Sequence, residues 1–208
     1  MSKAEQLQKI YQKLEKDLPK LPLGDIGENT VPGDGDPESE IMFIGEAPGY
    51  YESIERKPFI GRSGQLFVNT SAELGYPREK VYISNIVKVR PPDNRDPLPK
   101  EIAAYRPYLD EEIEIIQPKL IVTLGRFSMQ KFLPDVKISQ VHGRLHKVKW
   151  KDRTLYILPM YHPAAALRNP QTKASFVSDF QKIPKIIEWL HNKSESDTLE
   201  ASIKEALL

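Results

Sequence analysis

Three segments of this chain place small, polar and charged residues where they could bind a ligand or help to break a bond. The first is the turn GEAPG at 45–49, with PFIGRSG at 58–64 a short distance beyond it. Glycine and proline in such a turn make a rigid backbone, whose N–H groups can hold a water molecule or an anion. A plain loop between a strand and a helix has the same composition, so this turn alone leaves both interpretations open.

The other two segments each carry one side chain suited to recognition or catalysis. Asn85 follows a short apolar run and leads into the basic, proline-rich stretch KVRPPDNRDP at 88–97, although its ordinary role would be that of a turn or capping residue. His162 opens the segment HPAAALRNP at 162–170, in which Leu167 and Arg168 are suited to wedge into a base stack and grip a phosphate. A solvated loop and a structural histidine are the competing interpretations.

Short apolar runs alternate with helical patterns and predict the elements that position these segments. We expect strands at 41–45, 81–84, 120–124 and 155–159, a weaker strand at 145–150, and helices at about 3–16, 63–74, 106–116, 126–133 and 174–190. Pro107 would then lie in the first turn of a helix, where its missing N–H costs little. The pattern predicts a doubly wound α/β fold, in which ligands bind beyond the carboxyl ends of the strands. We expect one domain over 1–193 and a polar tail over 194–208.

The composition excludes several classes of chemistry. The 208 residues include no cysteine and four histidines. Disulfides, cysteine nucleophiles, thiolate zinc sites and cysteine-held iron–sulphur clusters are therefore excluded, and we predict no metal site. The chain has no apolar run of about 18 residues, and its amino terminus is a mixed-charge amphipathic stretch, so we expect a cytoplasmic protein without membrane contact.

The net charge of +1 hides an uneven distribution along the chain. Residues 25–40 contain six acids and no Lys or Arg, whereas residues 41–193 contain 24 Lys and Arg against 16 Asp and Glu. This basic surplus suits a polyanion such as nucleic acid, whose phosphates supply most sequence-independent affinity. Ordinary surface solubility would also explain it. For the acidic stretch we expect a solvated loop.

Taken together, the order and spacing of these segments resemble the uracil-DNA glycosylase superfamily. GEAPG, PFIGRSG, the strand end SNIVKVRPPDNRDP and HPAAALRNP are similar to those of the family-four, thermostable type, as are PKLIVTLG at 118–125 and VHGRLH at 141–146. The likeness covers roughly residues 18–190. It implies a three-layer α/β sandwich with a central, mostly parallel four-stranded sheet. It also implies a repair enzyme that flips uracil out of DNA and hydrolyses its glycosidic bond.

The resemblance assigns four residues to the flipped base. Phe59 would stack on uracil, and the Asn85 amide would pair with O4 and N3–H, where cytosine presents the opposite donor and acceptor. Glu52 would lie near C5 and help to exclude the methyl group of thymine. His162 would face O2 and stabilise the uracil anion that leaves as the sugar acquires oxocarbenium character.

The resemblance also assigns the water and the contacts to DNA. The superfamily's water-activating aspartate falls near Ala47, which has no titratable group, so we expect Glu46 or a backbone-held water to take that role. Leu167 and Arg168 would fill and clamp the vacated duplex. Phosphate contacts are expected by position from Arg62, Lys88 and Arg90.

The chain departs from the family at the ligands of its iron–sulphur cluster. Where the family has four cysteines, the residues here are Leu18, Leu21, Val89 and Tyr105. We therefore expect no cofactor. We also expect these four side chains to form a hydrophobic plug between the amino-terminal helix, the basic loop and the helix that contains Tyr105.

Two other functions stay open at this point. A glycosylase of shifted specificity would remove hypoxanthine or xanthine, and a non-catalytic member of the superfamily would bind DNA without turnover. Covalent capture of DNA is disfavoured, because the connection after RPP lacks the long basic insertion of a covalently trapping relative. The expected partner is uracil-containing DNA, single- or double-stranded, bound at the nucleoid by a monomer.

Overall fold

In the computed structural model, which describes residues 1–194, six strands form one sheet in the order β1-β3-β2-β4-β6-β5. The four central strands run parallel: β3 (Tyr82–Asn85), β2 (Ile41–Gly45), β4 (Leu120–Leu124) and β6 (Arg153–Met160). At the two edges, β1 (Asp34–Gly35) and β5 (His146–Trp150) pair antiparallel with their neighbours. The predicted α/β class with a mostly parallel sheet is confirmed, and the number of strands is corrected from four to six.

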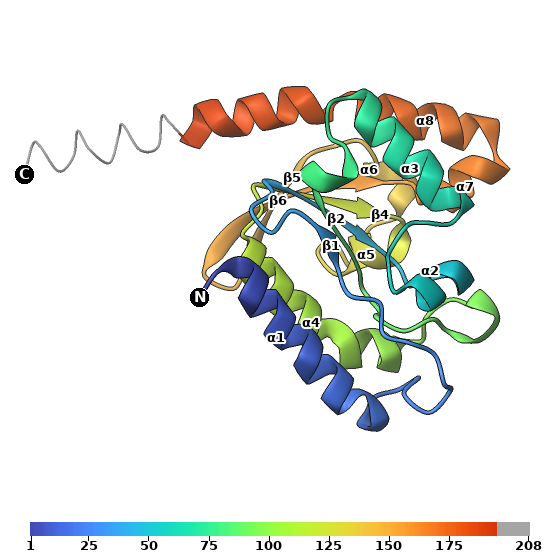
Figure 1. Ribbon diagram of the computed structural model, residues 1–208. Coiled ribbons are helices and arrows are strands. Elements are labelled where there is room, and N and C mark those ends of the chain that lie inside the picture. Colours follow the sequence, from blue (N-terminus) through green and yellow to red (C-terminus); the bar gives the residue numbers. More distant parts are fainter. Residues whose placement is uncertain (195–208) are drawn as a thin grey trace, which may run out of the picture.

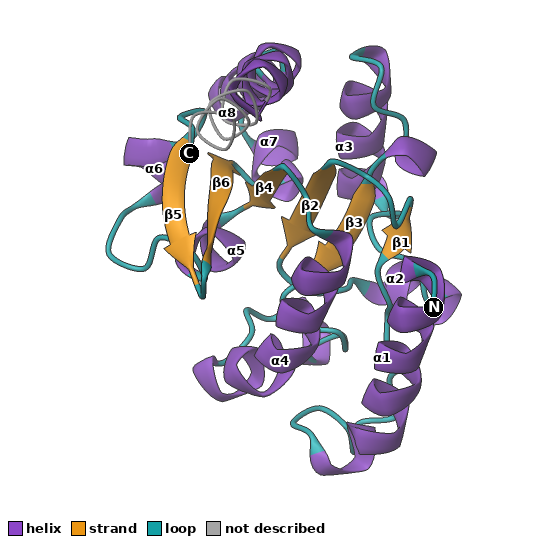
Figure 2. Cartoon of the chain, turned by 90° about the vertical axis from the view of Figure 1, so that its left-hand side faces the viewer, coloured by secondary structure: helices purple, strands orange, loops and turns teal. Residues whose placement is uncertain are grey.

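Helices cover both faces of this sheet and make three layers (Figures 1 and 2). In Figure 2, α3 (Arg62–Glu73), α7 (Pro163–Arg168) and α8 (Pro170–Phe180) lie above the sheet, and α1 (Lys3–Asp17) and α4 (Pro99–Ile116) lie below it. The connections hold the short helices α2 (Tyr50–Glu55), α5 (Arg126–Gln130) and α6 (Ile138–Val141), with 3-10 turns η1 (Leu18–Lys20), η2 (Arg78–Lys80) and η3 (Pro92–Asn94). A last helix covers 183–194. None of the helices within residues 1–194 is long and apolar enough to cross a membrane.

Strand β2 shows why the central strands are continuous apolar runs. Ile41 and Phe43 belong to the core shared with α3 and α8, whereas Met42 and Ile44 belong to the core shared with α1 and α4. Successive side chains of a strand point to opposite faces, so a strand covered on both sides needs apolar residues at every position. The sheet therefore separates two largely apolar cores, one on each of its faces.

The structure corrects two of the predicted helices. Helix α4 begins at Pro99 rather than at 106, and the Glu101 carboxylate accepts the Leu98 N–H at 2.8 Å to cap it. Pro107 therefore lies inside the helix and not in its first turn. The error arose because either proline is acceptable at a helix start. The helix predicted at 174–190 is two helices, and the predicted polar tail lies outside the described residues apart from Ser194.

Candidate active site

The carboxyl ends of the four parallel strands meet around a cavity of about 450 Å³. Its walls come from 46–49 after β2, from 91–96 after β3, from Gly125 and Arg126 after β4, and from 161–168 after β6. Phe59 and Ser63 close another side. Because β3 and β4 lie on opposite sides of β2, the strand order reverses here, which is where open α/β sheets bind their ligands. All three segments singled out from the sequence thus meet at one cavity.

Phe59 and Asn85 close over the end of β2. A Cβ atom added at Gly45 would lie 2.3 Å from Asn85 Oδ1 and 2.4 Å from the Phe59 ring. Phe59 is buried and has a φ of 56°, a left-handed conformation that bulky side chains rarely adopt. Gly64 allows this turn, because a Cβ there would lie 2.1 Å from the Phe59 carbonyl oxygen. Strained backbone of this kind gathers at ligand sites, where the surrounding structure holds it.

The Asn85 amide is buried without a partner. Within residues 1–194, four buried side-chain nitrogen or oxygen atoms lack a hydrogen bond, and two of them are Asn85 Nδ2 and Oδ1. The side chain is 2% exposed. Leaving such a group unpaired costs about 1–3 kcal/mol. An unpaired donor and an unpaired acceptor therefore lie side by side next to the ring of Phe59.

Glu52 holds the loop that carries Phe59. Its carboxylate accepts the Gly49 N–H at 3.2 Å and interacts with the backbone N–H groups of Phe59 and Gly61. Burial raises the pKa of Glu52, and these backbone donors oppose the shift. Glu52 also lines the cavity, so it braces the Phe59 loop from the cavity side. Its contact with C5 of the base stays a prediction.

His162 caps α7 and lines the cavity. Its Nδ1 accepts the Ala164 N–H at 3.1 Å, so the ring proton of the neutral form sits on Nε2. Burial, and then the positive charge of Arg168, lower the pKa of His162 to about 4. The ring centroids of Phe59 and His162 are 6.0 Å apart. At neutral pH the site therefore holds an uncharged imidazole of fixed tautomer.

Glu46 lines the cavity, and its pKa is shifted toward neutrality. Burial, and then the negative charge of Asp96, raise the pKa of Glu46 to about 7, while Arg126 opposes the shift. Asp96 and Arg126 form an ion pair at the cavity wall. Ala47 lines the cavity beside Glu46 and has no titratable group. Arg126 was not among the residues predicted from the sequence, although its place two residues after the end of β4 was an available signal.

The side chains predicted to touch DNA lie in different environments. Arg62, Leu167 and Arg168 are exposed, and Arg168 lines the cavity. Lys88 is instead fully buried, with Nζ at 2.6 and 2.8 Å from the two carboxylate oxygens of Glu112. A buried, paired ammonium cannot reach a phosphate, so the DNA contact predicted for Lys88 is wrong.

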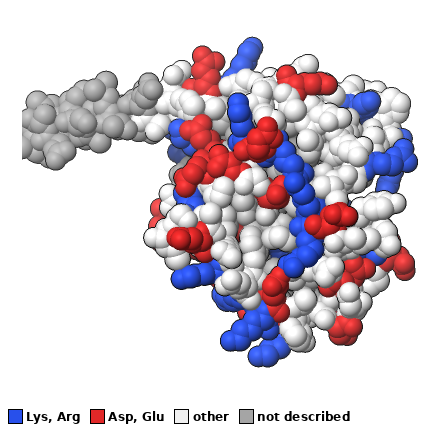
Figure 3. All heavy atoms as spheres, in the orientation of Figure 1, with Lys and Arg blue, Asp and Glu red and all other residues white. Residues whose placement is uncertain are grey.

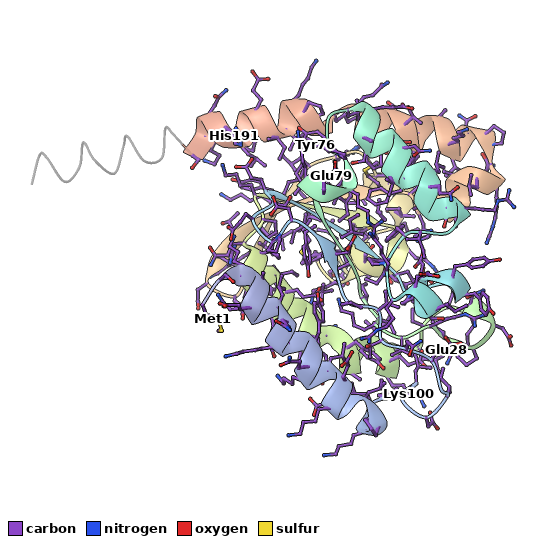
Figure 4. All side chains as sticks on the ribbon, viewed as in Figure 1. Met1, Glu28, Tyr76, Glu79, Lys100 and His191 are labelled. Atoms are coloured by element: carbon purple, nitrogen blue, oxygen red, sulfur yellow. The ribbon has the colours of Figure 1, made fainter. Side chains whose placement is uncertain are left out.

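Arg90 is held within the protein surface. Its Nη1 donates to Glu28 Oε1 at 2.9 Å, and its guanidinium lies 5.1 Å from the ring centroid of Tyr50. Glu28 is labelled in Figure 4. Asp34 likewise pairs with Arg78, so the acidic stretch docks on basic residues and the expected solvated loop is wrong. Acidic and basic side chains are interspersed over the face shown in Figure 3. A phosphate contact by Arg90 would have to displace Glu28.

The four positions that hold cluster cysteines in the family belong to one apolar core. Val89 and Tyr105 are fully buried in it, and Leu18 and Leu21 pack against it. The Tyr105 hydroxyl donates to the Pro22 carbonyl at 2.7 Å and ties α4 to the segment after α1. The predicted packing of these side chains is therefore present. Such side chains do not ligate iron, and the described part of the chain has no group of three metal-ligating side chains.

Comparison with known proteins agrees with this geometry. Residues 32–190 match the family described as the uracil DNA glycosylase superfamily. A type-4 uracil-DNA glycosylase of Sulfurisphaera tokodaii is 46% identical over 170 residues, which cover 79% of this chain and 77% of that protein. The type-4 uracil-DNA glycosylase of Saccharolobus solfataricus is 44% identical, over 79% of this chain and 79% of that protein. That of Archaeoglobus fulgidus is 42% identical, over 74% of this chain and 80% of that protein. This chain belongs to the uracil DNA glycosylase superfamily.

Proposed function

We propose that the protein removes uracil from DNA by hydrolysing the bond between N1 of the base and C1′ of the sugar, which leaves an abasic site. The observation that carries this proposal is the buried, unpaired amide of Asn85 beside Phe59. Uracil offers O4 as an acceptor and N3–H as a donor, which match the two halves of a carboxamide. Cytosine reverses both groups, so an Asn85 amide held in the orientation that fits uracil rejects cytosine.

His162 stabilises the leaving base as the glycosidic bond breaks. The electron pair of that bond passes to uracil, and part of the negative charge develops on O2. The Nε2–H of the neutral imidazole donates a hydrogen bond to this oxygen. Because the pKa of His162 is about 4, the ring acts as a hydrogen-bond donor and not as an acid. A donor already aimed at the developing charge needs no reorganisation during the reaction.

Glu46 orients the water that completes the hydrolysis. The oxocarbenium carbon C1′ takes the water oxygen, and the proton released passes to the Glu46 carboxylate or to solvent. A carboxyl group with a pKa of about 7 can alternate between the two forms at neutral pH. Ala47 supplies only its backbone here. Arg62, Leu167 and Arg168, all exposed, contact the DNA around the flipped nucleotide.

We also infer that the protein works as a monomer without an iron–sulphur cluster. The chain has no cysteine, and the four positions concerned are filled by apolar or aromatic side chains that pack together. Iron analysis of the purified protein, with its absorption spectrum near about 400 nm, tests this directly. Stoichiometric iron would contradict the inference.

The function is tested by single-turnover excision on oligonucleotides that contain uracil, hypoxanthine or xanthine, as single strands and as duplexes, with abasic sites read as alkali-labile breaks. Uracil should be the best substrate. A preference for hypoxanthine or xanthine would support a shifted specificity instead, and DNA binding without breaks would support a non-catalytic member. Asn85→Asp should lower uracil excision about 100-fold or more while binding to undamaged DNA changes little. Equal losses of uracil excision and of binding to undamaged DNA would show that Asn85 does not contact the base.

A further inference from the structure

Tyr50 and Tyr51 form an exposed aromatic pair at the edge of the cavity. The two side chains are 53% and 67% exposed, and their ring centroids are 5.3 Å apart at an interplanar angle of 78°. They open α2 directly after Gly49, which lines the cavity. Single exposed apolar residues need no explanation, but neighbouring rings beside a ligand site indicate a contact surface.

Buried contacts hold α2 in the orientation that exposes this pair. Glu52 and Ser53 are buried on the inner side of the helix, and Ser53 Oγ donates to the Tyr50 carbonyl at 2.9 Å. Asn29 Nδ2 donates to the Ser53 carbonyl at 3.0 Å. The inner side is therefore fixed by the same carboxylate that braces the Phe59 loop, and the rings face outward from a rigid support.

Arg90 stacks on Tyr50 and holds its ring in place. Its Nε donates to Asn94 Oδ1 at 2.8 Å, and Asn94 also lines the cavity. With Glu28 on its other side, the guanidinium keeps its place 5.1 Å from the ring centroid. An arginine held on one face of a ring orders that ring. Its charge is already paired with Glu28, so what the pair offers to DNA is aromatic surface on which bases can stack.

We propose that Tyr50 and Tyr51 are a stacking platform for unpaired bases that flank the flipped uracil on the same DNA strand. Every base offers an aromatic face, so stacking on tyrosine needs no particular sequence. The platform continues the base cavity, and in Figure 1 α2 lies on the same side of the molecule as α7, which carries Leu167. The inference rests on the proposed DNA substrate and extends it: unpaired strands gain contacts that a closed duplex cannot use.

The test compares the affinities of an undamaged oligonucleotide as a single strand and as a duplex of the same sequence, measured by fluorescence anisotropy at one salt concentration. The double variant Tyr50→Leu/Tyr51→Leu keeps apolar bulk without aromatic faces and should lose about tenfold single-strand affinity for each ring. Its loss on the duplex should be several-fold smaller. Tyr50→Phe/Tyr51→Phe restores the aromatic faces and should recover most of the single-strand affinity. Ile54→Ala, an exposed apolar change on the same helix, is the matched control.

Several results would overturn the platform. One is an equal loss of affinity for the single strand and the duplex in the leucine double variant, and a second is unchanged affinity for both. A third is a phenylalanine double variant that binds the single strand as weakly as the leucine double variant does. Unchanged affinity for both is the result expected if the rings instead bind another protein. Because the oligonucleotide is undamaged, the outcome does not depend on excision. A protein that shows the contrast between phenylalanine and leucine but never cleaves uracil would refute the proposed function and leave the platform standing.

Discussion

Replacing Glu46 by glutamine should remove the acid limb of the pH–rate profile of uracil excision. The pKa of Glu46 is raised to about 7 by burial and by Asp96, so the carboxylate population grows as pH rises through 7. At pH 5 only about 1% of a group with this pKa is ionised. If the carboxylate orients the water, kcat/KM of the natural protein should fall about 100-fold between pH 8 and pH 5.

The same profile separates Glu46 from His162. Protonation of His162 affects the rate only near its own pKa of about 4, well below the limb expected from Glu46. Glu46→Gln should therefore be nearly flat between pH 8 and pH 5, at a rate below that of the natural protein at pH 8. Asp96→Asn removes a negative charge next to Glu46 and leaves Arg126 unpaired, so it should move the acid limb to lower pH.

The assay is single-turnover excision from a uracil-containing duplex at constant ionic strength. Alkali-labile breaks are counted from about pH 4.5 to about pH 8.5, a range that spans the expected midpoint of about 7. Glu55→Gln makes the same change at an exposed acid of α2 and should keep the natural profile. An acid limb that survives in Glu46→Gln would assign the titration to another group. A natural protein with no limb in this range would refute the role of the carboxylate altogether.

Three further predictions follow from the packing. Gly45→Ala places a methyl group 2.3 Å from Asn85 Oδ1 and 2.4 Å from the Phe59 ring. Uracil excision should therefore fall about 100-fold or more, while circular dichroism still shows a folded protein. Normal excision would mean that Asn85 and Phe59 do not bind the base. Lys88→Met removes the positive charge beside the buried Glu112 carboxylate, which keeps only its hydrogen bonds from Tyr11 and Ser84, and should cost about 3–5 kcal/mol in urea unfolding. The double variant Lys88→Met/Glu112→Leu should regain part of that stability, because it removes the unpaired charge but also the acceptor of Ser84, and it should keep its DNA affinity. Lost DNA affinity in a folded double variant would show that Lys88 contributes to DNA binding. His162→Ala should lower the single-turnover rate about 100-fold or more, with little change in duplex affinity. A small effect on the rate would show that His162 does not stabilise the charge on O2.

Local sequence was sufficient to predict the parallel sheet and the place of the site. Strand β2 needs apolar residues on both faces, and GEAPG follows it directly, so the position of Glu46 and Ala47 at a strand end could be read from the chain. The replacement of four cysteines was equally visible. Packing of Leu18 and Tyr105 into one core followed from their apolar character and from the family likeness. The two-residue strand β1 was missed because so short a segment has no periodicity.

Only the tertiary structure decided which charges are free and which are paired. Lys88 and Arg90 are two residues apart in one basic segment, yet Lys88 meets Glu112, 24 residues later, in the core, while Arg90 meets Glu28 at the surface. The pKa of Glu46 depends in the same way on Asp96 and Arg126, which reach it from other strand ends. The amino-acid sequence alone determined the kind of fold and the residues available at the strand ends, because apolar periodicity and motif order are local. Ionisation, burial and pairing depend on contacts between distant segments, and those exist only once the chain has folded.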